Sequence, residues 1–320
     1  MYMFKYILKR LGLMIMTFSI IIIICFVLIK LLPIVIDVQW GRDADIIRNQ
    51  LEARGYYDPI PVQFFNYIKR IVLNGDWGIG VNLSEYRNMP VWDVFVKKLP
   101  PTVLINIYSS LIAVPIGIAL GIFAALKKNK WQDHTISTSV MVFISVPSFV
   151  YAFLVQYLLC FKLNLFPKTM LGGYDYFTVE MFKSMFPSVI SLSFGSIAGY
   201  ARFTRAELTE VLTSEFMLLA RTKGLTKGQA TTRHALRNAM VPIFPMIIGE
   251  FISVLSGSLI IEKIFSVPGV GGLYLAAINS NDYDFFMLLS AFYTFVGLAA
   301  GIVIDISYGF IDPRIRMGAK

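Results

Sequence analysis

Two acidic residues, Glu250 and Asp305, stand inside long apolar stretches of the 320-residue chain. A carboxylate within a bilayer is costly and usually faces a protein interior or a water-filled cavity. Glu250 lies near the middle of its stretch, so it either lines a substrate route or pairs with a polar group of a neighbouring span. For Asp305, two turns from the end of its stretch, a structural role is favoured.

Motifs for covalent chemistry are missing from the sequence. It has no GxxxxGK[ST] phosphate loop, no HExxH and no GxSxG. The two histidines, His134 and His234, are far apart, and both cysteines, Cys25 and Cys160, lie in apolar runs. We therefore expect no enzymatic activity in this chain, no metal site, no disulfide framework and no cofactor.

A basic segment, "LLARTKGLTKGQATTRHALRNAM" (218–240), carries five Lys or Arg, one His and no acid. A helix is predicted over Ala206–Lys223, ended by Gly224 at the C′ position. Thr226 is a natural N-cap, with Gln229 completing a capping box, so a second helix is predicted from about Lys227 to Asn238.

Such a stiff helix–turn–helix elbow could dock on a partner and carry force. Its cations and two small residues, Ala220 and Ala230, suit docking into a groove of that partner. The alternative is an ordinary basic loop of a membrane protein, which explains the charge but not the two capped helices.

The elements that must position these residues are membrane helices. The chain is 56% hydrophobic and 15% charged, with a mean hydropathy of +0.66, whereas soluble domains are about 25% charged. A span needs about 20 apolar residues. Six are predicted, and the fourth is the weakest: Leu11–Leu32, Thr102–Leu126, Thr135–Cys160, Phe186–Ala201, Met240–Ile261 and Phe286–Ile311.

Close packing and breaks are also predicted within the spans. Gly117 and Gly121 form a GxxxG pair, which is typical of tight helix–helix contacts. Pro115 and Pro147 are expected to interrupt the second and third spans, because proline removes a backbone donor.

Charge predicts the orientation. With the amino terminus inside, the inner segments hold 16 Lys or Arg, against 4 in the two short outer loops. The positive-inside rule therefore places both termini and the basic segment in the cytoplasm. The net charge of +9 thus reflects topology, and nucleic-acid binding is not expected.

Three regions follow. Residues 1–32 are the cytoplasmic amino terminus and first span. Residues 33–101 form a folded extracytoplasmic loop domain, with helices expected near Ala44–Arg54 and Pro61–Leu73 before the turn-rich "NGDWGIG" (74–80). Residues 102–320 form the transmembrane domain, including a cytoplasmic loop at 202–239.

The basic segment resembles the cytoplasmic coupling loop in permease subunits of bacterial ABC importers, most closely the dipeptide/oligopeptide branch. Ala220-Arg221-Thr222-Lys223-Gly224 matches one part of that loop, and His234 to Ala239 followed by Pro242 matches the other. The wider family's Glu-Ala-Ala falls on Leu218-Leu219-Ala220, so only the last alanine is kept. Gly224 is the firmest anchor.

Other motifs extend the resemblance over nearly the whole chain. They are Gly75-Asp76-x-Gly78, Leu99-Pro100-Pro101-Thr102, Phe265-x-x-Pro268-Gly269-x-Gly271, Asp282-Tyr283 and Asp312-Pro313-Arg314-Ile315-Arg316. After Asp282-Tyr283 the branch usually continues with proline, and this chain has Asp284. The long first outer loop is similar to that of the B-type subunit.

The resemblance implies an all-α polytopic membrane protein with the type I ABC importer fold, in a bacterial cell membrane. It implies half of a heterodimeric channel for peptides, with a second homologous permease, one or two ABC ATPase subunits, an extracytoplasmic peptide-binding protein and membrane lipid as partners. Coupling to the ATPase is expected at Ala220, Arg221, Lys223, Gly224, Thr226, Arg233, His234, Arg237 and Asn238. Contact with the binding protein is expected at Asp76, Trp77, Pro268, Gly269 and Asp282.

Two alternatives remain open from the sequence. One is a permease of the same branch for another small solute, such as a nickel chelate or glutathione. The other, less favoured, is a stand-alone secondary transporter that uses Glu250 and Asp305 as ion or proton sites.

Overall fold

The computed structural model describes residues 2–32, 45–46, 48–49, 52–53, 55–173 and 175–311. These residues are helical apart from turns, loops and two isolated β-bridges. The predicted helix near Ala44–Arg54 lies partly outside them, although residues 45–46, 48–49 and 52–53 are helical. The closing motif Asp312–Arg316 and the tail 312–320 lie outside the described residues altogether.

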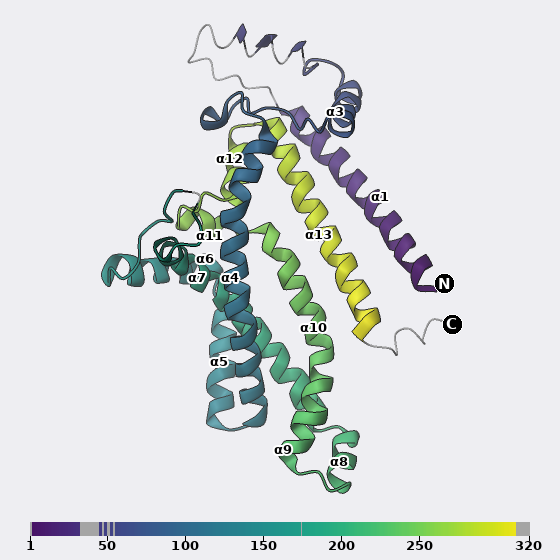
Figure 1. The fold of residues 1–320 in the computed structure, drawn as a ribbon, viewed down its shortest axis with the longest axis vertical. Helices are drawn as coiled ribbons and strands as arrows, with labels where there is room; N and C mark the ends of the chain where they lie inside the picture. Colours follow the sequence, from purple (N-terminus) through teal and green to yellow (C-terminus); the bar gives the residue numbers. More distant parts are fainter. Residues whose placement is uncertain are drawn as a thin grey trace. The chain divides into compact units, whose positions relative to one another are not determined.

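The helices are labelled in Figure 1. The long helices are α1 (Tyr2–Leu31), α4 (Val91–Leu126), α7 (Val179–Leu212), α10 (Leu236–Ser253) and α13 (Tyr283–Ile311). The shorter α-helices are α3 (Ile60–Asn74), α5 (Trp131–Ser145), α6 (Ser148–Val155), α8 (Glu215–Thr222), α9 (Lys227–Ala230), α11 (Leu259–Ile264) and α12 (Val270–Asn279). Single turns of 3₁₀ helix occur at Ser84–Tyr86 and Val254–Ser256, and π-helical segments at Gln156–Lys162 and Thr231–Ala235.

Four of these helical segments are long and apolar enough to cross a membrane: Tyr6–Leu31, Val91–Leu126, Lys227–Ser256 and Tyr283–Gly309. They correspond to the predicted first, second, fifth and sixth spans, with ends that differ from the predicted ones. The fifth ends earlier than predicted, because the chain turns at Gly257, where φ is +63°, and Ile261 belongs to the separate helix α11.

The predicted third span is a broken one. Helix α5 and the segment Ser148–Lys162 meet at Val146–Pro147 with a bend of 102°, as expected for a proline that cannot continue a helix. By contrast, α4 runs through Pro115 without a break, so the predicted interruption there is wrong. The described residues thus hold four apolar spanning helices, or five if the bent pair counts as one span.

The predicted fourth span, Phe186–Ala201, lies within α7, which is long but less apolar. Its serines account for this composition, and many of them are buried inside the protein. Ser191 and Ser193 donate hydrogen bonds to the carbonyls of Pro187 and Val189, each at 2.7 Å. A helix enclosed by other helices can carry such residues, so its hydropathy alone does not identify it as a span.

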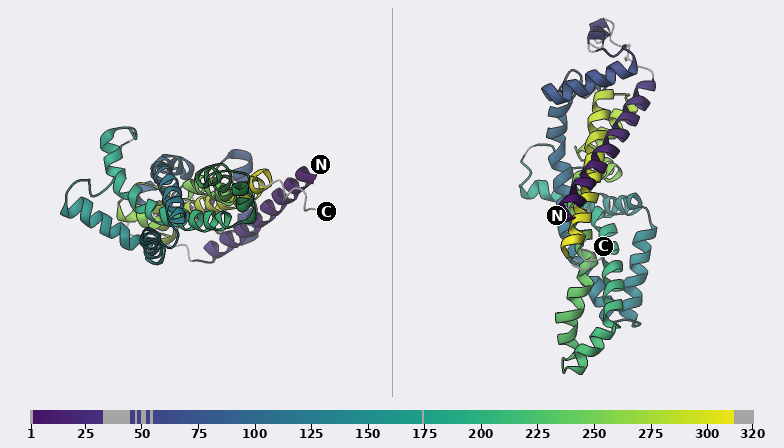
Figure 2. Two further views of the ribbon diagram at one scale, coloured as in Figure 1. Left: turned by 90° about the horizontal axis from the view of Figure 1, so that it is seen from below. Right: turned by 90° about the vertical axis from the view of Figure 1, so that its right-hand side faces the viewer.

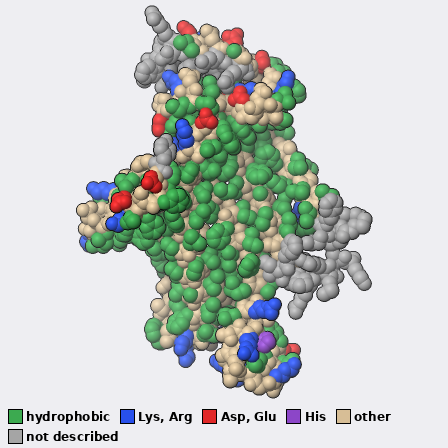
Figure 3. Space-filling model, in the orientation of Figure 1, with side chains coloured by type: hydrophobic (Ala, Val, Ile, Leu, Met, Phe, Trp, Pro, Cys, Tyr) green, Lys and Arg blue, Asp and Glu red, His purple; other side chains and the backbone are tan. Residues whose placement is uncertain are grey.

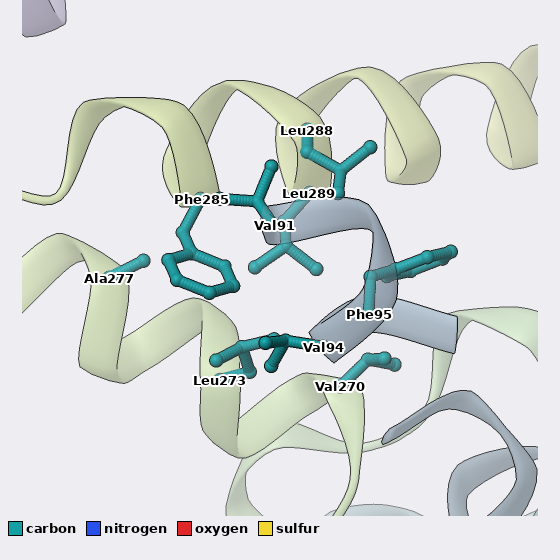
Figure 4. Packing of buried hydrophobic residues seen from close by; sticks show 9 residues of the cluster. All are labelled: Val91, Val94, Phe95, Val270, Leu273, Ala277, Phe285, Leu288 and Leu289. Carbon is teal, nitrogen blue, oxygen red and sulfur yellow. The ribbon is translucent and has the colours of Figure 1, made fainter. Parts of the chain in front are cut away.

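The structure divides into two compact units: residues 1–102 with 256–259 and 268–299, and residues 103–255 with 260–267 and 300–320. In the first unit α4, α12 and α13 enclose a core, shown in Figure 4, that contains Phe95, Leu273 and Phe285. A second core joins α1, α3 and α13 through Phe26, Tyr67 and Met287.

In the second unit α7 is the central helix and contacts α5, α6 and α10. It also approaches α4 closely at the predicted GxxxG pair. A Cβ atom added to Gly117 would lie 2.6 Å from Tyr200 Cβ, and one added to Gly121 would lie 2.5 Å from Thr204 Cβ. The predicted close-packing face is therefore confirmed, since only glycine leaves room for α7.

This contact predicts a measurable cost for a single methyl group. Gly121→Ala should destabilise the purified chain by about 1–3 kcal/mol, because the contact atoms belong to the helix backbone and Cβ positions. Thermal unfolding in detergent, followed by circular dichroism, would measure it.

Gly199→Ala is the matched control on the facing helix, because nothing lies within 4 Å of its added Cβ. It should leave the midpoint temperature of unfolding unchanged or raise it slightly, since alanine favours the helix over glycine by up to about 1 kcal/mol. Equal midpoints for both variants would contradict the close packing.

Candidate functional site

The basic segment forms the predicted elbow. Helix α8 ends at Thr222, Gly224 adopts a left-handed φ of +93°, and α9 begins at Lys227. The capping box is present: the Gln229 N–H donates to Thr226 Oγ1 at 3.3 Å, and the Thr226 N–H donates to Gln229 Oε1 at 3.1 Å. The turn is therefore set by local hydrogen bonds and by one residue that tolerates positive φ.

Both helix boundaries of the elbow differ from the prediction. The first helix does not run from Ala206 to Lys223, because α7 ends at Leu212 and α8 begins at Glu215. Two side-chain hydroxyls bind backbone carbonyls of the last turn of α7 at this break. Thr213 donates to the carbonyl of Glu210 at 2.9 Å and Ser214 to that of Val211 at 2.6 Å. The second helix does not stop at Asn238 but continues through α10.

The two alanines expected to dock on a partner are buried within the chain. Ala220 and Ala230 pack with Leu208, Met217 and Ala235 in one apolar cluster. Their small size allows α8 and α9 to pack against the end of α7. The structure thus corrects the idea that they lie in a docking face, and gives them the role of holding the elbow together.

The polar residues of the elbow point outward. Arg221, Lys223, Gly224 and Thr226 are exposed, as are Arg233, His234, Arg237 and Asn238. Two apolar side chains, Leu218 and Leu219, are also exposed. Figure 3 shows Lys, Arg and His side chains gathered where α8 and α9 lie. We call this set, with Lys227, the cationic elbow surface; it is typical of a docking site for an acidic partner.

An ion pair that the sequence analysis missed secures the helix leading into the elbow. Arg205 of α7 binds both carboxylate oxygens of Asp133 at the start of α5, and its Nη2 lies 2.8 Å from Oδ2. Asp133 is buried and also accepts the Asn129 N–H at 2.9 Å. Asp133 is the one acid in the basic loop 127–134, a signal that could have indicated a paired carboxylate.

Glu250 has a partner on the neighbouring helix. Its carboxylate accepts a hydrogen bond from Ser196 of α7 at 2.8 Å, and one turn away the Tyr200 hydroxyl donates to the Met246 carbonyl at 3.2 Å. Glu250 is only partly buried, so it both links α7 to α10 and keeps an open side. Asp305 on α13 is also partly buried.

In the first unit, two of the sequence motifs meet. Thr102, which closes the Leu99–Thr102 motif, is buried, and its Oγ1 accepts the first N–H of α12, from Val270, at 3.0 Å. Gly269, the residue before α12, is buried, and Pro268 is partly exposed. Asp76 and Trp77 are partly exposed as well, and Asp76 accepts the Gly78 N–H at 2.8 Å.

Asp282 does not offer its carboxylate to a partner. It is fully buried, and one oxygen accepts the N–H groups of Val81, Asn82 and Leu83 at 2.8, 2.8 and 3.1 Å. Burial raises the pKa of this carboxyl above its usual value, against the opposing effect of the three N–H donors. The expected contact with a binding protein is corrected here: Asp282 organises the loop 79–83 from inside.

Asp284 stands at the position where permeases of the peptide branch usually have proline. Its carboxylate lies in surroundings similar to those of Asp282. It is buried and accepts the Ile79 N–H at 3.1 Å, with the Arg70 guanidinium 4.0 Å away. A Cβ on Gly78, where φ is +103°, would collide with this carboxylate. Nearby, the Lys30 ammonium lies 3.7 Å from the ring centre of Tyr56. Both acids thus fasten the loop to the start of α13.

No cluster of three or more His, Cys, Asp or Glu side chains that could hold a metal ion occurs among the described residues.

Residues 117–317, which include the elbow, match the family model described as binding-protein-dependent transport system inner membrane component. The chain belongs to this family. As a permease of binding-protein-dependent transport it is a non-catalytic membrane component with several spanning helices. Such permeases work with a binding protein and an ABC ATPase.

Relatives of this permease span the full chain. It is 32% identical over 315 residues to the dipeptide transport system permease protein DppB of Lactococcus lactis subsp. cremoris, covering 98% of this chain and 100% of that protein. It is 32% identical over 316 residues to the oligopeptide transport system permease protein OppB of Salmonella typhimurium, with the same coverage. The glutathione transport system permease protein GsiC of Salmonella choleraesuis is 30% identical over 321 residues, covering 98% and 99%.

A solved structure supports the fold. The crystal structure of an amino acid ABC transporter with histidines matches with a TM-score of 0.50 and 19% identity, covering 68% of this chain and 94% of that one. The full-length relatives confirm the resemblance to the B-type peptide permeases, and the chain is an ABC importer permease of the peptide/glutathione branch.

Because the Asp282 carboxylate is buried and binds three N–H groups, its removal is predicted to destabilise the loop around it. Asp282→Ala leaves three N–H groups of the permease without their acceptor and should cost about 3 kcal/mol. Proteolysis of the purified protein should then cut within 79–90 faster than in the wild type.

Asp93→Ala is the control, since this acid is exposed in the first turn of α4 and should cost at most about 1 kcal/mol. Unchanged cleavage in Asp282→Ala would show that the loop does not depend on this side chain.

Proposed function

We propose that this permease forms half of a translocation channel for dipeptides or oligopeptides and pairs with a second, homologous permease. The observation that carries the proposal is a rigid, outward-facing cationic elbow in a chain related over its full length to peptide permeases. One or two ABC ATPase subunits supply the energy, and an extracytoplasmic binding protein delivers the peptide.

The cationic elbow surface is the proposed contact with the ATPase. It comprises Lys227 and the exposed members of the predicted set, which are Arg221, Lys223, Gly224, Thr226, Arg233, His234, Arg237 and Asn238. The chain runs helically from Lys227 to Ser256, through α9, a π-helical turn and α10. A displacement at α9 would therefore move α10 as a rod, with no flexible loop to absorb it.

The proposed topology has six spans, with α7 as the fourth and both termini in the cytoplasm. An even number of spans agrees with the distribution of Lys and Arg. The burial of serines on α7 explains why this helix is less apolar than the others.

Glu250 is proposed to line the pathway. Its hydrogen bond to Ser196 holds the carboxylate between α7 and α10, and its partly open side would be costly against lipid. On the outer side, Asp76, Trp77, Pro268 and Gly269 remain the proposed contacts with the binding protein, with Gly269 acting through backbone because it is buried.

Glutathione is the second candidate substrate, because a glutathione permease is nearly as similar as the peptide permeases. Reconstitution with the cognate binding protein and ATPases would separate the two: labelled dipeptide, oligopeptide and glutathione are offered in turn, and the bound solute is identified by mass spectrometry. We expect ATP-dependent uptake of peptide. Uptake of glutathione alone would overturn the peptide assignment.

Gly224→Val is predicted to disrupt coupling. With φ at +93° and nothing within 4 Å of an added Cβ, the cost is conformational, about 1–2 kcal/mol for a residue with a Cβ. Membrane levels should stay normal, while peptide-stimulated ATP hydrolysis and uptake fall roughly tenfold, since 1.4 kcal/mol corresponds to that factor.

Gly228→Val is the matched control in the same elbow. It is also exposed with open space around it, but its φ is helical. This variant should transport normally. Wild-type uptake by Gly224→Val would mean that the elbow acts only as a basic loop.

The topology predicts labelling from opposite sides. Single cysteines at Ser84 and Lys227, both exposed, are tested in sealed, right-side-out vesicles of a chain lacking Cys25 and Cys160. A membrane-impermeant thiol reagent should modify Ser84→Cys directly and Lys227→Cys only after permeabilisation. Labelling of both from one side would contradict the six-span arrangement.

A further inference from the structure

Helix α3 is apolar on two faces. One face, formed by Ile60, Phe64, Tyr67 and Ile71, packs into the core shared with α1 and α13. The other carries large apolar side chains that are mostly exposed: Phe65 is 68% exposed, Val72 74% and Leu73 68%. A cap domain surrounded by water would not be expected to keep such a stripe uncovered.

Packing against α1 fixes the depth of α3. The ring of Phe26 lies 5.2 Å from that of Phe64 and 5.5 Å from that of Tyr67, and Ile29 belongs to the same core. These two α1 residues lie in the last two turns of a 26-residue span, Tyr6–Leu31. Since about 20 residues cross the hydrocarbon, α3 lies at the level of the membrane boundary.

The direction of α3 agrees with that position. Figures 1 and 2 together show α3 running across the end of α1 rather than along it. Over the same turns the open side of α1 is also apolar, with Leu28 and Leu31 well exposed. The exposed apolar surface of α1, which suits contact with lipid, therefore continues onto α3, which lies across the end of α1.

The remaining side chains of α3 suit a headgroup region. Asn66, Lys69 and Asn74 are exposed, and Lys69 lies between Phe65 and Leu73, one turn from each. A Lys on an apolar helix face can reach lipid phosphates while its stem stays in the apolar layer. Tyr57, just before the helix, is exposed as well, and tyrosines concentrate at this level.

From this geometry we propose that α3 is an interfacial helix that inserts Phe65, Val72 and Leu73 into the lipid leaflet at the carboxyl end of α1. The occupant of the stripe is bilayer lipid. This anchors the loop domain to the membrane surface, so that the loop 74–90 starts from a fixed height. The inference does not depend on the transported solute.

Spin labelling tests the inference directly. In a full-length chain without Cys25 and Cys160, single cysteines replace Phe65 or Val72, and Asn74 serves as the matched control, because it is exposed and polar and lies about half a turn around the same helix from Phe65. The labelled chains are placed in vesicles of phosphatidylethanolamine and phosphatidylglycerol. The collision rate of each spin label with oxygen, which concentrates in lipid, is compared with its collision rate with a water-soluble nickel chelate.

We expect oxygen to exceed the nickel chelate at Phe65→Cys and Val72→Cys, and the reverse order at Asn74→Cys. Chelate access at all three positions would show that α3 stands in water and would overturn the proposal. The measurement is repeated after assembly with the second permease, the ATPases and the binding protein. Loss of both collisions at Phe65→Cys would show that a protein covers the stripe, which also overturns it.

Discussion

The close approach of α4 and α7 is the constraint on which the second unit depends. Gly117 and Gly121 lack the Cβ atoms that would collide with Tyr200 and Thr204, so the two backbones come within direct contact. When two helices associate within a bilayer, the hydrophobic effect does not stabilise their contact. Close van der Waals packing and interhelical hydrogen bonds stabilise it instead. Ser109 and Ser193, 3.2 Å apart across the same pair, supply such a bond.

Once α7 is held in this way, its other faces position the rest of the unit. Ser196 reaches Glu250 on α10, and Arg205 reaches Asp133 at the start of α5. Both pairs are polar contacts between α7 and a neighbouring helix, and each satisfies a group that would otherwise be costly to bury. The end of α7 then leads into α8 and the alanine-rich cluster, so the elbow is attached to a helix that is fastened on several sides.

In the first unit, buried carboxylates hold one loop that has no regular secondary structure of its own. The loop 79–83 has isolated bridges but no extended ladder. Its N–H groups are satisfied by Asp282 and Asp284, except that of Gly80, which donates to the carbonyl of Met89. Buried backbone donors need acceptors, and two acids at the start of α13 provide them. A surface loop acquires a defined shape because its hydrogen-bond partners belong to a long helix.

The sequence by itself determined the features that depend on neighbouring residues. The lengths of the apolar runs are read directly from the order of the residues. The break at Pro147, the capping box of Thr226 and Gln229, and the positive φ of Gly224 arise within one or two turns, where local chemistry suffices. Only the tertiary structure decided the direction in which side chains face. It turned Ala220 and Asp282 inward, paired Arg205 with Asp133, and enclosed the serines of α7. These outcomes depend on residues distant in the chain, and composition carries no information about which distant surface will cover a given side chain.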